Sequence, residues 1–186
     1  MRNSVSGSSS PPRQTGHVGF FLRFPRCVAL PLIGVALAFA LLSSGCTVQT
    51  QVENAIGQGV NQIRAQAGLP PLTADPQLAA IARDRAQDMA TLNYFSHSPP
   101  DGCPARCLMQ RAGITPGWTG EIMAWDDAPS ASTAGMALSM WRNSPTHMTV
   151  ITGRCFTRMG AGAAFTQDGK SYFVVVFEGD LPGCTQ

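Results

Sequence analysis

A run of fifteen apolar residues at positions 28–42 constrains this chain more than any other feature of its sequence. A helix needs about 20 residues to span a bilayer, so the run is short for a permanent anchor and has the length of the apolar core of an export signal. The preceding residues are rich in Ser, Pro, Gly and Arg. We therefore predict an export signal at residues 1–46 and one folded domain at residues 47–186.

The end of the predicted signal has two interpretations. Ser43, Ser44 and Gly45 precede Cys46, and this ending resembles the lipobox of bacterial lipoproteins, in which the cysteine becomes the acylated first residue. The box usually has an aliphatic residue where this chain has Ser43. The alternative is an ordinary signal peptide cleaved near Gly45. The first interpretation predicts a lipoprotein on the outer face of the cell membrane, attached through lipidation of Cys46, and the second predicts a secreted protein.

The distribution of charge argues against nucleic acid as a partner. Four of the thirteen basic residues and no acidic residue precede position 47, which leaves nine basic and eleven acidic residues in the predicted domain. A basic leader before a slightly acidic body provides no basic surface for a polyanion.

The four cysteines of the predicted domain indicate disulfide bonds in an oxidising compartment, and four cysteines allow three pairings. The segments 155–165 and 171–178 read as two strands of a hairpin joined by a turn at 167–169. In that register Cys155 lies within reach of Cys184.

This pairing leaves Cys103 and Cys107 to bond across a short loop. The alternative is a zinc site formed by Cys103, Cys107 and nearby His97, which is less compatible with an oxidising compartment.

Apolar periodicity and capping residues predict the remaining elements. Asp75 and Pro76 are typical of a helix start, and Asn93 of a helix end. We expect the buried side chains of this helix to include Leu92. The other elements expected are helices over 52–67, 104–112 and 130–142 (with Met136, Met140 and Trp141 in the core), a strand over 121–125, and a short turn of helix through Ile151. These elements predict an α+β fold, a three-layer α-β-α sandwich with a small, mostly antiparallel sheet between helices.

His97, Glu121 and His147 are the candidate site, because His97 and His147 are the two histidines of the predicted domain. Two neutral imidazoles and a carboxylate form a known zinc ligand set that leaves a position open for water. In an enzyme, Glu121 could alternatively act as a general base. The sequence contains no His-Glu-x-x-His or Gly-x-Ser-x-Gly motif. The structural alternative is a polar cluster in which the three side chains bond one another and hold their loops.

Four motifs together resemble the short bacterial CAP domain, whose superfamily includes cysteine-rich secretory proteins, antigen five and pathogenesis-related protein one. They are His97 after an aromatic-Ser pair, Gly-Glu at 120–121, Trp-x-x-Ser-Pro-x-His at 141–147, and Leu-Thr-Ala-Asp-Pro-Gln-Leu at 72–78. The resemblance implies a sandwich with a cavity lined by a His-Glu-Glu-His tetrad that binds a divalent cation in some members.

Carried over by position, His97, Glu121 and His147 take three of the four tetrad positions. Ser144 stands in place of the other glutamate, and Ile122 in place of an asparagine next to Glu121. A hydroxyl binds a divalent cation more weakly than a carboxylate does. The resemblance therefore implies a cavity lined by these four polar residues, with weak affinity for a cation such as zinc.

We consequently expect an exported, envelope-associated protein that binds a divalent cation or a small, lipid-like ligand, with cell-envelope components as further partners. Two alternatives stay open. One is a metal-dependent hydrolase or protease acting on peptide or cell-wall substrates, and the other is a disulfide-stapled scaffold that presents a surface to a partner.

Overall fold

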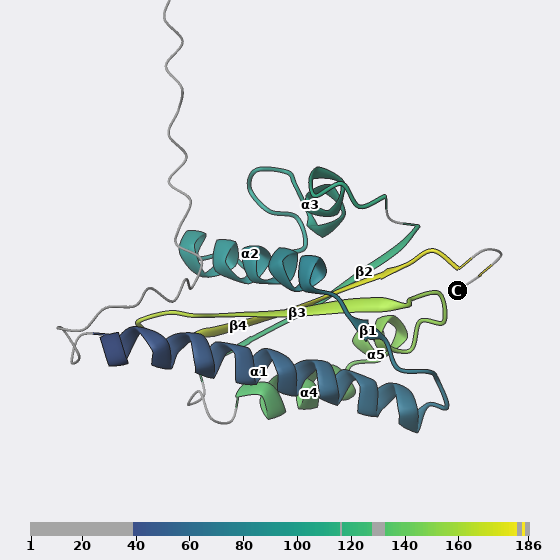
Figure 1. The fold of residues 1–186 in the computed structure, drawn as a ribbon, viewed down its shortest axis with the longest axis horizontal. Helices are drawn as coiled ribbons and strands as arrows, with labels where there is room; N and C mark the ends of the chain where they lie inside the picture. The colour runs from purple at the N-terminus through teal and green to yellow at the C-terminus, as the bar shows by residue number, and fades with distance from the viewer. Residues whose placement is uncertain (1–38, 116, 128–132, 182–183, 185–186) are drawn as a thin grey trace, which may run out of the picture. The chain divides into compact units, whose positions relative to one another are not determined.

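The computed structural model describes residues 39–115, 117–127, 133–181 and 184, and Figure 1 shows the arrangement of their helices and strands. The elements in chain order are α1 (Phe39–Gln66), β1 (Thr73–Ala74), α2 (Pro76–Leu92), α3 (Ala105–Arg111), β2 (Trp118–Asp126), α4 (Thr133–Arg142), α5 (Pro145–Ile151), β3 (Arg158–Phe165) and β4 (Ser171–Gly179). Most of the predicted export signal lies outside the described residues, and α1 begins inside its last part. None of the described helices is long and apolar enough to cross a membrane.

The four strands form one sheet in the order β1-β3-β4-β2. β4 is antiparallel to both β3 and β2, and the short β1 is parallel to β3. All nine residues of β4 are buried, because it has a strand on each side and helices on each face. The mostly antiparallel sheet expected from the closing hairpin is therefore confirmed.

Two apolar cores lie on the two faces of this sheet. One core packs α1, α4 and α5 against the sheet around Ile56, Trp141 and Phe177. The other packs α2 and α3 against the opposite face around Leu78 and Val176. Alternate residues of β4 thus enter opposite cores, as the period of a strand requires, and the predicted three-layer α-β-α sandwich is confirmed (Figure 1).

The capping residues of α2 act as the sequence predicts. The Asp75 carboxylate accepts hydrogen bonds from the amides of Gln77 and Leu78, and Asn93 ends the helix in the left-handed conformation with φ 50°. Other bounds differ from expectation. α1 is longer than the helix predicted over 52–67, β2 extends beyond 121–125 on both sides, and β1 was not predicted because two residues carry no periodic pattern.

Both predicted disulfides are present. Cys155 and Cys184 bond across the end of the hairpin with their Cα atoms 5.6 Å apart, and Cys103 and Cys107 bond with their Cα atoms 5.2 Å apart. Since Cys103 and Cys107 bond each other, the alternative zinc site that combined them with His97 is wrong.

Three side chains expected in the core are exposed instead. Leu92 ends α2 and is 54% exposed, while Met136 and Met140 lie on the outer side of α4. Trp141 is fully buried as predicted, and its indole N–H donates to the Met123 carbonyl at 3.0 Å. Apolar residue type predicted burial for all four, but Leu92 lies at the last position of its helix, and Met136 and Met140 lie on a different face of α4 from Trp141.

Candidate functional site

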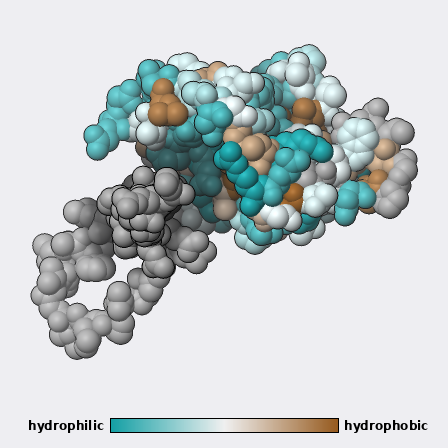
Figure 2. All heavy atoms as spheres, turned by 90° about the horizontal axis from the view of Figure 1, so that it is seen from above, coloured by the Kyte–Doolittle hydropathy of each residue, from teal (hydrophilic) through white to brown (hydrophobic). Residues whose placement is uncertain are grey.

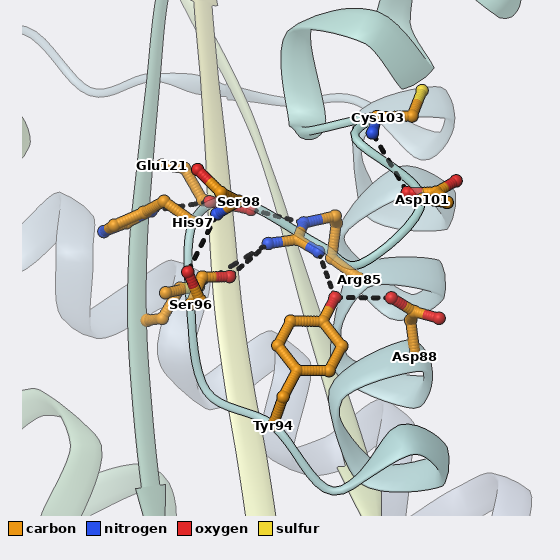
Figure 3. Close-up of polar contacts among 10 residues, drawn as sticks. Arg85, Asp88, Tyr94, Ser96, His97, Ser98, Asp101, Cys103 and Glu121 are labelled. Carbon is orange, nitrogen blue, oxygen red and sulfur yellow. Dashed lines mark hydrogen bonds and ion pairs between the residues drawn. The ribbon is translucent and has the colours of Figure 1, made fainter.

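Residues from three separate segments supply the predicted site. His97 lies in the loop after α2, Glu121 lies on β2 facing the α2 side, and His147 lies on α5, with Ser144 as the residue that precedes this helix. His97 Nδ1 lies 2.7 Å from Glu121 Oε2 (Figure 3). The structure therefore brings together two of the predicted residues in direct contact, although they are 24 positions apart in sequence.

The second oxygen of Glu121 is held by an arginine that the sequence analysis did not identify. Arg85 Nε donates to Glu121 Oε1 at 2.9 Å, and the Arg85 side chain is 1% exposed. The guanidinium also donates to the Tyr94 hydroxyl at 2.7 Å and to the Ser96 carbonyl at 2.8 Å (Figure 3). Arg85 thus ties the loop that carries His97 to the strand that carries Glu121.

A signal for Arg85 was present in the sequence. Arg85 follows Leu78, Ile81 and Ala82 at helical spacing and precedes Met89, and all five side chains are buried on one face of α2. A cation on the buried face of a helix requires a charged or strongly polar partner, because burial of an unpaired charge is costly. The pattern predicts that a partner exists but does not say which residue it is.

The electrostatics of the cluster follow from these contacts. Burial lowers the pKa of Arg85, but the bonds to Glu121 and Tyr94 raise it by more, so the net pKa is raised. Burial, together with the hydrogen bond that Tyr94 donates to Asp88, raises the pKa of Tyr94 to about 12. Tyr94 therefore stays protonated at neutral pH, and its hydroxyl links Asp88 to the Arg85 guanidinium through two hydrogen bonds.

His147 stands near this cluster but makes no bond to it among the described residues. Its Nδ1 atom is buried and has no hydrogen-bond partner within the part of the chain that the structure describes. Burial, and next the charge of His97, lower the pKa of His147. The lowered pKa favours the neutral form of His147. Ser144 is partly buried, and its side chain makes no capping bond to α5.

The predicted metal ligands His97, Glu121 and His147 stay a prediction. Within the described residues no group of three or more His, Cys, Asp and Glu side chains is arranged to hold a metal ion. Both oxygens of Glu121 make contacts with other side chains, one with Arg85 and the other with His97.

The same contacts limit the role of Glu121 as a general base. A base needs an oxygen directed at the substrate proton, whereas the Glu121 oxygens already accept from a guanidinium and an imidazole. Glu121 is better described as the residue that orients His97, whose side chain is 61% exposed (Figure 3).

A cavity of about 340 Å³ lies elsewhere, beside β3 between α1 and α2. Its walls include Asn54, Gln58, Asp75, Arg83 and Ala161, and none of the predicted site residues lines it.

Comparisons with known proteins agree with the fold. The model of the cysteine-rich secretory protein family, abbreviated CAP, matches residues 58–177. An uncharacterized protein of Bacillus subtilis, YkwD, is 34% identical over 111 residues, which cover 59% of this chain and 41% of that relative. Pathogenesis-related protein 1C of Nicotiana tabacum is 27% identical over 135 residues, or 73% of this chain and 69% of the relative.

Solved structures give the same result. An extracellular protein of Bacillus anthracis that contains an SCP domain has a TM-score of 0.60 at 27% identity and matches 71% of this chain. An outer surface protein of Borrelia burgdorferi has a TM-score of 0.62 at 19% identity, with 70% of this chain and 94% of that chain covered. The match spans 41% of the Bacillus anthracis chain, so only part of that protein corresponds to the present fold.

Proposed function

The chain belongs to the cysteine-rich secretory protein (CAP) family, and from this premise we propose that it is an exported binding protein. Its site, formed by His97, Glu121 and His147, takes a small polar ligand or a weakly held divalent cation and does not turn it over.

The observation that carries this proposal is the buried Nδ1 atom of His147, which has no hydrogen-bond partner among the described residues. Leaving a buried polar atom without a partner costs about 1–3 kcal/mol. A bound cation or ligand donor at this atom would remove that cost. His97, oriented by Glu121 and largely exposed, supports the proposal because it offers its second ring nitrogen to the same ligand.

Binding is favoured over hydrolysis by the state of Glu121. A metal-dependent hydrolase needs a metal held by several ligands and a base near the attacking water. In this chain the one carboxylate of the site is paired with Arg85 and His97 instead. The cluster therefore supports a fixed recognition surface.

Export is supported by the two disulfides and by the extracellular protein of Bacillus anthracis, which is 27% identical. The predicted lipidation of Cys46 remains part of the proposal. A radiolabelled palmitate experiment in a bacterial host tests it, because Cys46→Ser removes the label only when this cysteine carries the acyl chain.

Titration of the full chain with Zn²⁺, followed by the ring proton signals of the histidines, tests the site. We expect weak binding that His97→Gln and His147→Gln each reduce by at least about tenfold, because each removes one of two ligands. His17→Gln in the leader is the matched control and should change nothing. Absence of Zn²⁺ binding, or binding that persists when both His97 and His147 are replaced, would overturn the cation-binding part of the proposal.

The ligand-binding part needs a separate probe. Free imidazole at millimolar concentration presents one donor and one acceptor of the size of a small polar ligand. We expect imidazole to shift the ring proton signals of His147 in the metal-free protein. In the variant His147→Gln we expect imidazole to cause no shift in the signals of the neighbouring His97.

A further inference from the structure

Exposed apolar side chains from every layer of the sandwich gather at one end of it. Val48 on α1, Leu92 at the end of α2, Trp125 on β2 and Phe165 at the end of β3 are between 37% and 54% exposed. Single exposed apolar residues are common on proteins. The face of the domain in Figure 2 is an example, since its brown groups are separated by hydrophilic ones. A group of four at one end requires a reason.

The strand register places Trp125 and Phe165 at the same end of the sheet but on opposite faces, since Trp125 is aligned through Tyr172 with Ala164. β2 and β3 run in the same direction, because both are antiparallel to the strand between them, β4. Ser171, the first residue of β4, is aligned with Asp126 on one side and with Phe165 on the other. β2 and β3 therefore finish at the same end of the sheet, one on each side of β4.

The direction of α2 brings Leu92 to the same end. A Cβ atom on Gly160 would lie 2.0 Å from the Ala79 amide, and one on Gly162 would lie 2.2 Å from the Arg83 amide. α2 thus advances along β3 in the direction of that strand. Its last residue, Leu92, lies toward the strand ends.

The direction of α1 completes the group. Gly57 lies beside Met159, whereas Gln49 and Glu53 nearer the start of the helix bond the backbone of Ala163. α1 therefore runs opposite to β3 and begins at the end where β3 finishes. In Figure 1 the start of α1, the β3–β4 turn and the end of α2 all lie on the left.

An apolar segment of the sequence directly precedes this end of the domain. The apolar run at 28–42 joins directly to α1, which begins at Phe39, and Cys46 lies two residues before Val48. The acyl chain proposed on Cys46 would bring a bilayer next to the described apolar side chains.

We propose that Val48, Leu92, Trp125 and Phe165, which we call the apolar end, rest on the surface of a lipid bilayer. Tryptophan is enriched at membrane–water interfaces because its ring is apolar and its N–H is polar. The proposal uses export and attachment from the proposed function and is independent of the histidine site.

The charge of the side chains at this end determines which kind of bilayer we expect it to bind. Asp127 follows β2 and is exposed, and Asp168 in the β3–β4 turn is balanced by Lys170 at 3.2 Å. Among the described residues at this end, basic side chains are not in excess over acidic ones, so they do not provide a site for anionic headgroups. We therefore expect the apolar end to bind a zwitterionic phosphatidylcholine surface at least as well as an anionic one.

Quenching of tryptophan fluorescence by brominated lipid tests the proposal in the full chain reconstituted in phosphatidylcholine vesicles. The chain has three tryptophans. Trp125 belongs to the apolar end, Trp141 is buried in the core, and Trp118 is 38% exposed at the opposite end of β2. Seven residues of strand separate Trp118 from Trp125 by about 23 Å. Trp118 is thus a built-in control of similar exposure.

We expect brominated lipid to quench the tryptophan fluorescence of the wild type and of Trp118→Phe alike. It should have little effect on the fluorescence of Trp125→Phe. A second variant, Leu92→Asp, should reduce the quenching of Trp125 while its circular dichroism stays that of the wild type. Equal quenching in the two tryptophan variants, quenching lost only in Trp118→Phe, or no quenching at all would overturn the proposal. Quenching that persists in His97→Gln and His147→Gln would show that it is separate from the histidine site.

Discussion

Two buried arginines show how single residues hold the loops of this domain. Arg85 pairs with the carboxylate of Glu121, whereas Arg64 is fully buried and donates to the carbonyls of Pro70, Ile151 and Gly153. Ile151 is the last residue of α5, so the hydrogen bond from Arg64 to its carbonyl caps the helix that carries His147. Burial lowers the pKa of Arg64, since desolvation disfavours its charged form.

Replacement of Arg85 by methionine tests the pair with Glu121. This change leaves a carboxylate, 9% exposed, without its cation, and breaking a buried pair from one side typically costs about 3–5 kcal/mol. We expect a loss of this size in the free energy of urea unfolding. The double variant Arg85→Met with Glu121→Gln should recover part of it, and a double variant no more stable than the single one would contradict the coupling.

His147 makes the stability of the domain depend on pH. Its pKa is lowered in the folded protein, while in the unfolded chain it is about 6.5. As the pH falls through about 6.5, the unfolded chain binds a proton at His147 that the folded chain does not bind, so the free energy of unfolding decreases. This stability is fully present above that pH and is lost below it.

We expect His147→Gln to flatten the decline measured by urea unfolding between about pH 7 and pH 5 in chelator-treated buffer. The histidine in the leader serves again as the control, since His17→Gln should keep the wild-type slope. Identical slopes for the wild type and His147→Gln would show that the burial of this ring has no energetic effect.

The site was predicted in part, for a physical reason. Histidine and glutamate are rare enough in this domain that their chemistry singled out His97, Glu121 and His147. Residue type could not show that a buried guanidinium occupies one oxygen of Glu121, because the contact joins positions 36 apart. The three-ligand metal set stays a prediction.

At the scale of elements, the packing of α2 on β3 depends on two glycines. Gly160 and Gly162 lie directly under the backbone of α2, closer than any side chain would permit. The elements themselves were well predicted where local chemistry fixed them, as at Asp75 and Asn93. The exposure of Leu92 was not predicted, because a helical pattern does not show where the partner sheet ends.

Gly162→Ala is expected to push α2 away from the sheet. Its new Cβ would meet the Arg83 amide at 2.2 Å, and such overpacking typically costs about 1–3 kcal/mol. Gly135 on α4 is the matched control, because a Cβ there meets nothing within 4 Å. Gly135→Ala should raise the unfolding free energy by about 0.5–1 kcal/mol through its better helix propensity. Destabilisation of similar size in both variants would argue against a specific contact.

At the scale of the whole molecule, two disulfides stabilise loops of very different length. The Cys155–Cys184 bond has a sequence separation of 29 residues, and the Cys103–Cys107 bond a separation of 4. The sequence predicted both pairs because the hairpin turn fixes the register, which in turn fixes the reach of Cys155.

Removal of the longer link should cost more. In the chain-entropy model we expect a loss of about 3–4 kcal/mol for Cys155→Ser with Cys184→Ser, and about 2 kcal/mol for Cys103→Ser with Cys107→Ser. Thermal unfolding of the two double variants beside the wild type measures the difference. A larger loss from the shorter link would point to a native-state role for it beyond restricting the unfolded chain.

The position of β4 between β2 and β3 also sets when the domain can form during synthesis. β2 and β3 meet only through β4, and β4 is the last strand in the chain. A nascent polypeptide that has emerged as far as β3 therefore lacks the strand that pairs with both β2 and β3. The sheet of this domain can therefore close only after the last of its strands, β4, has been synthesised.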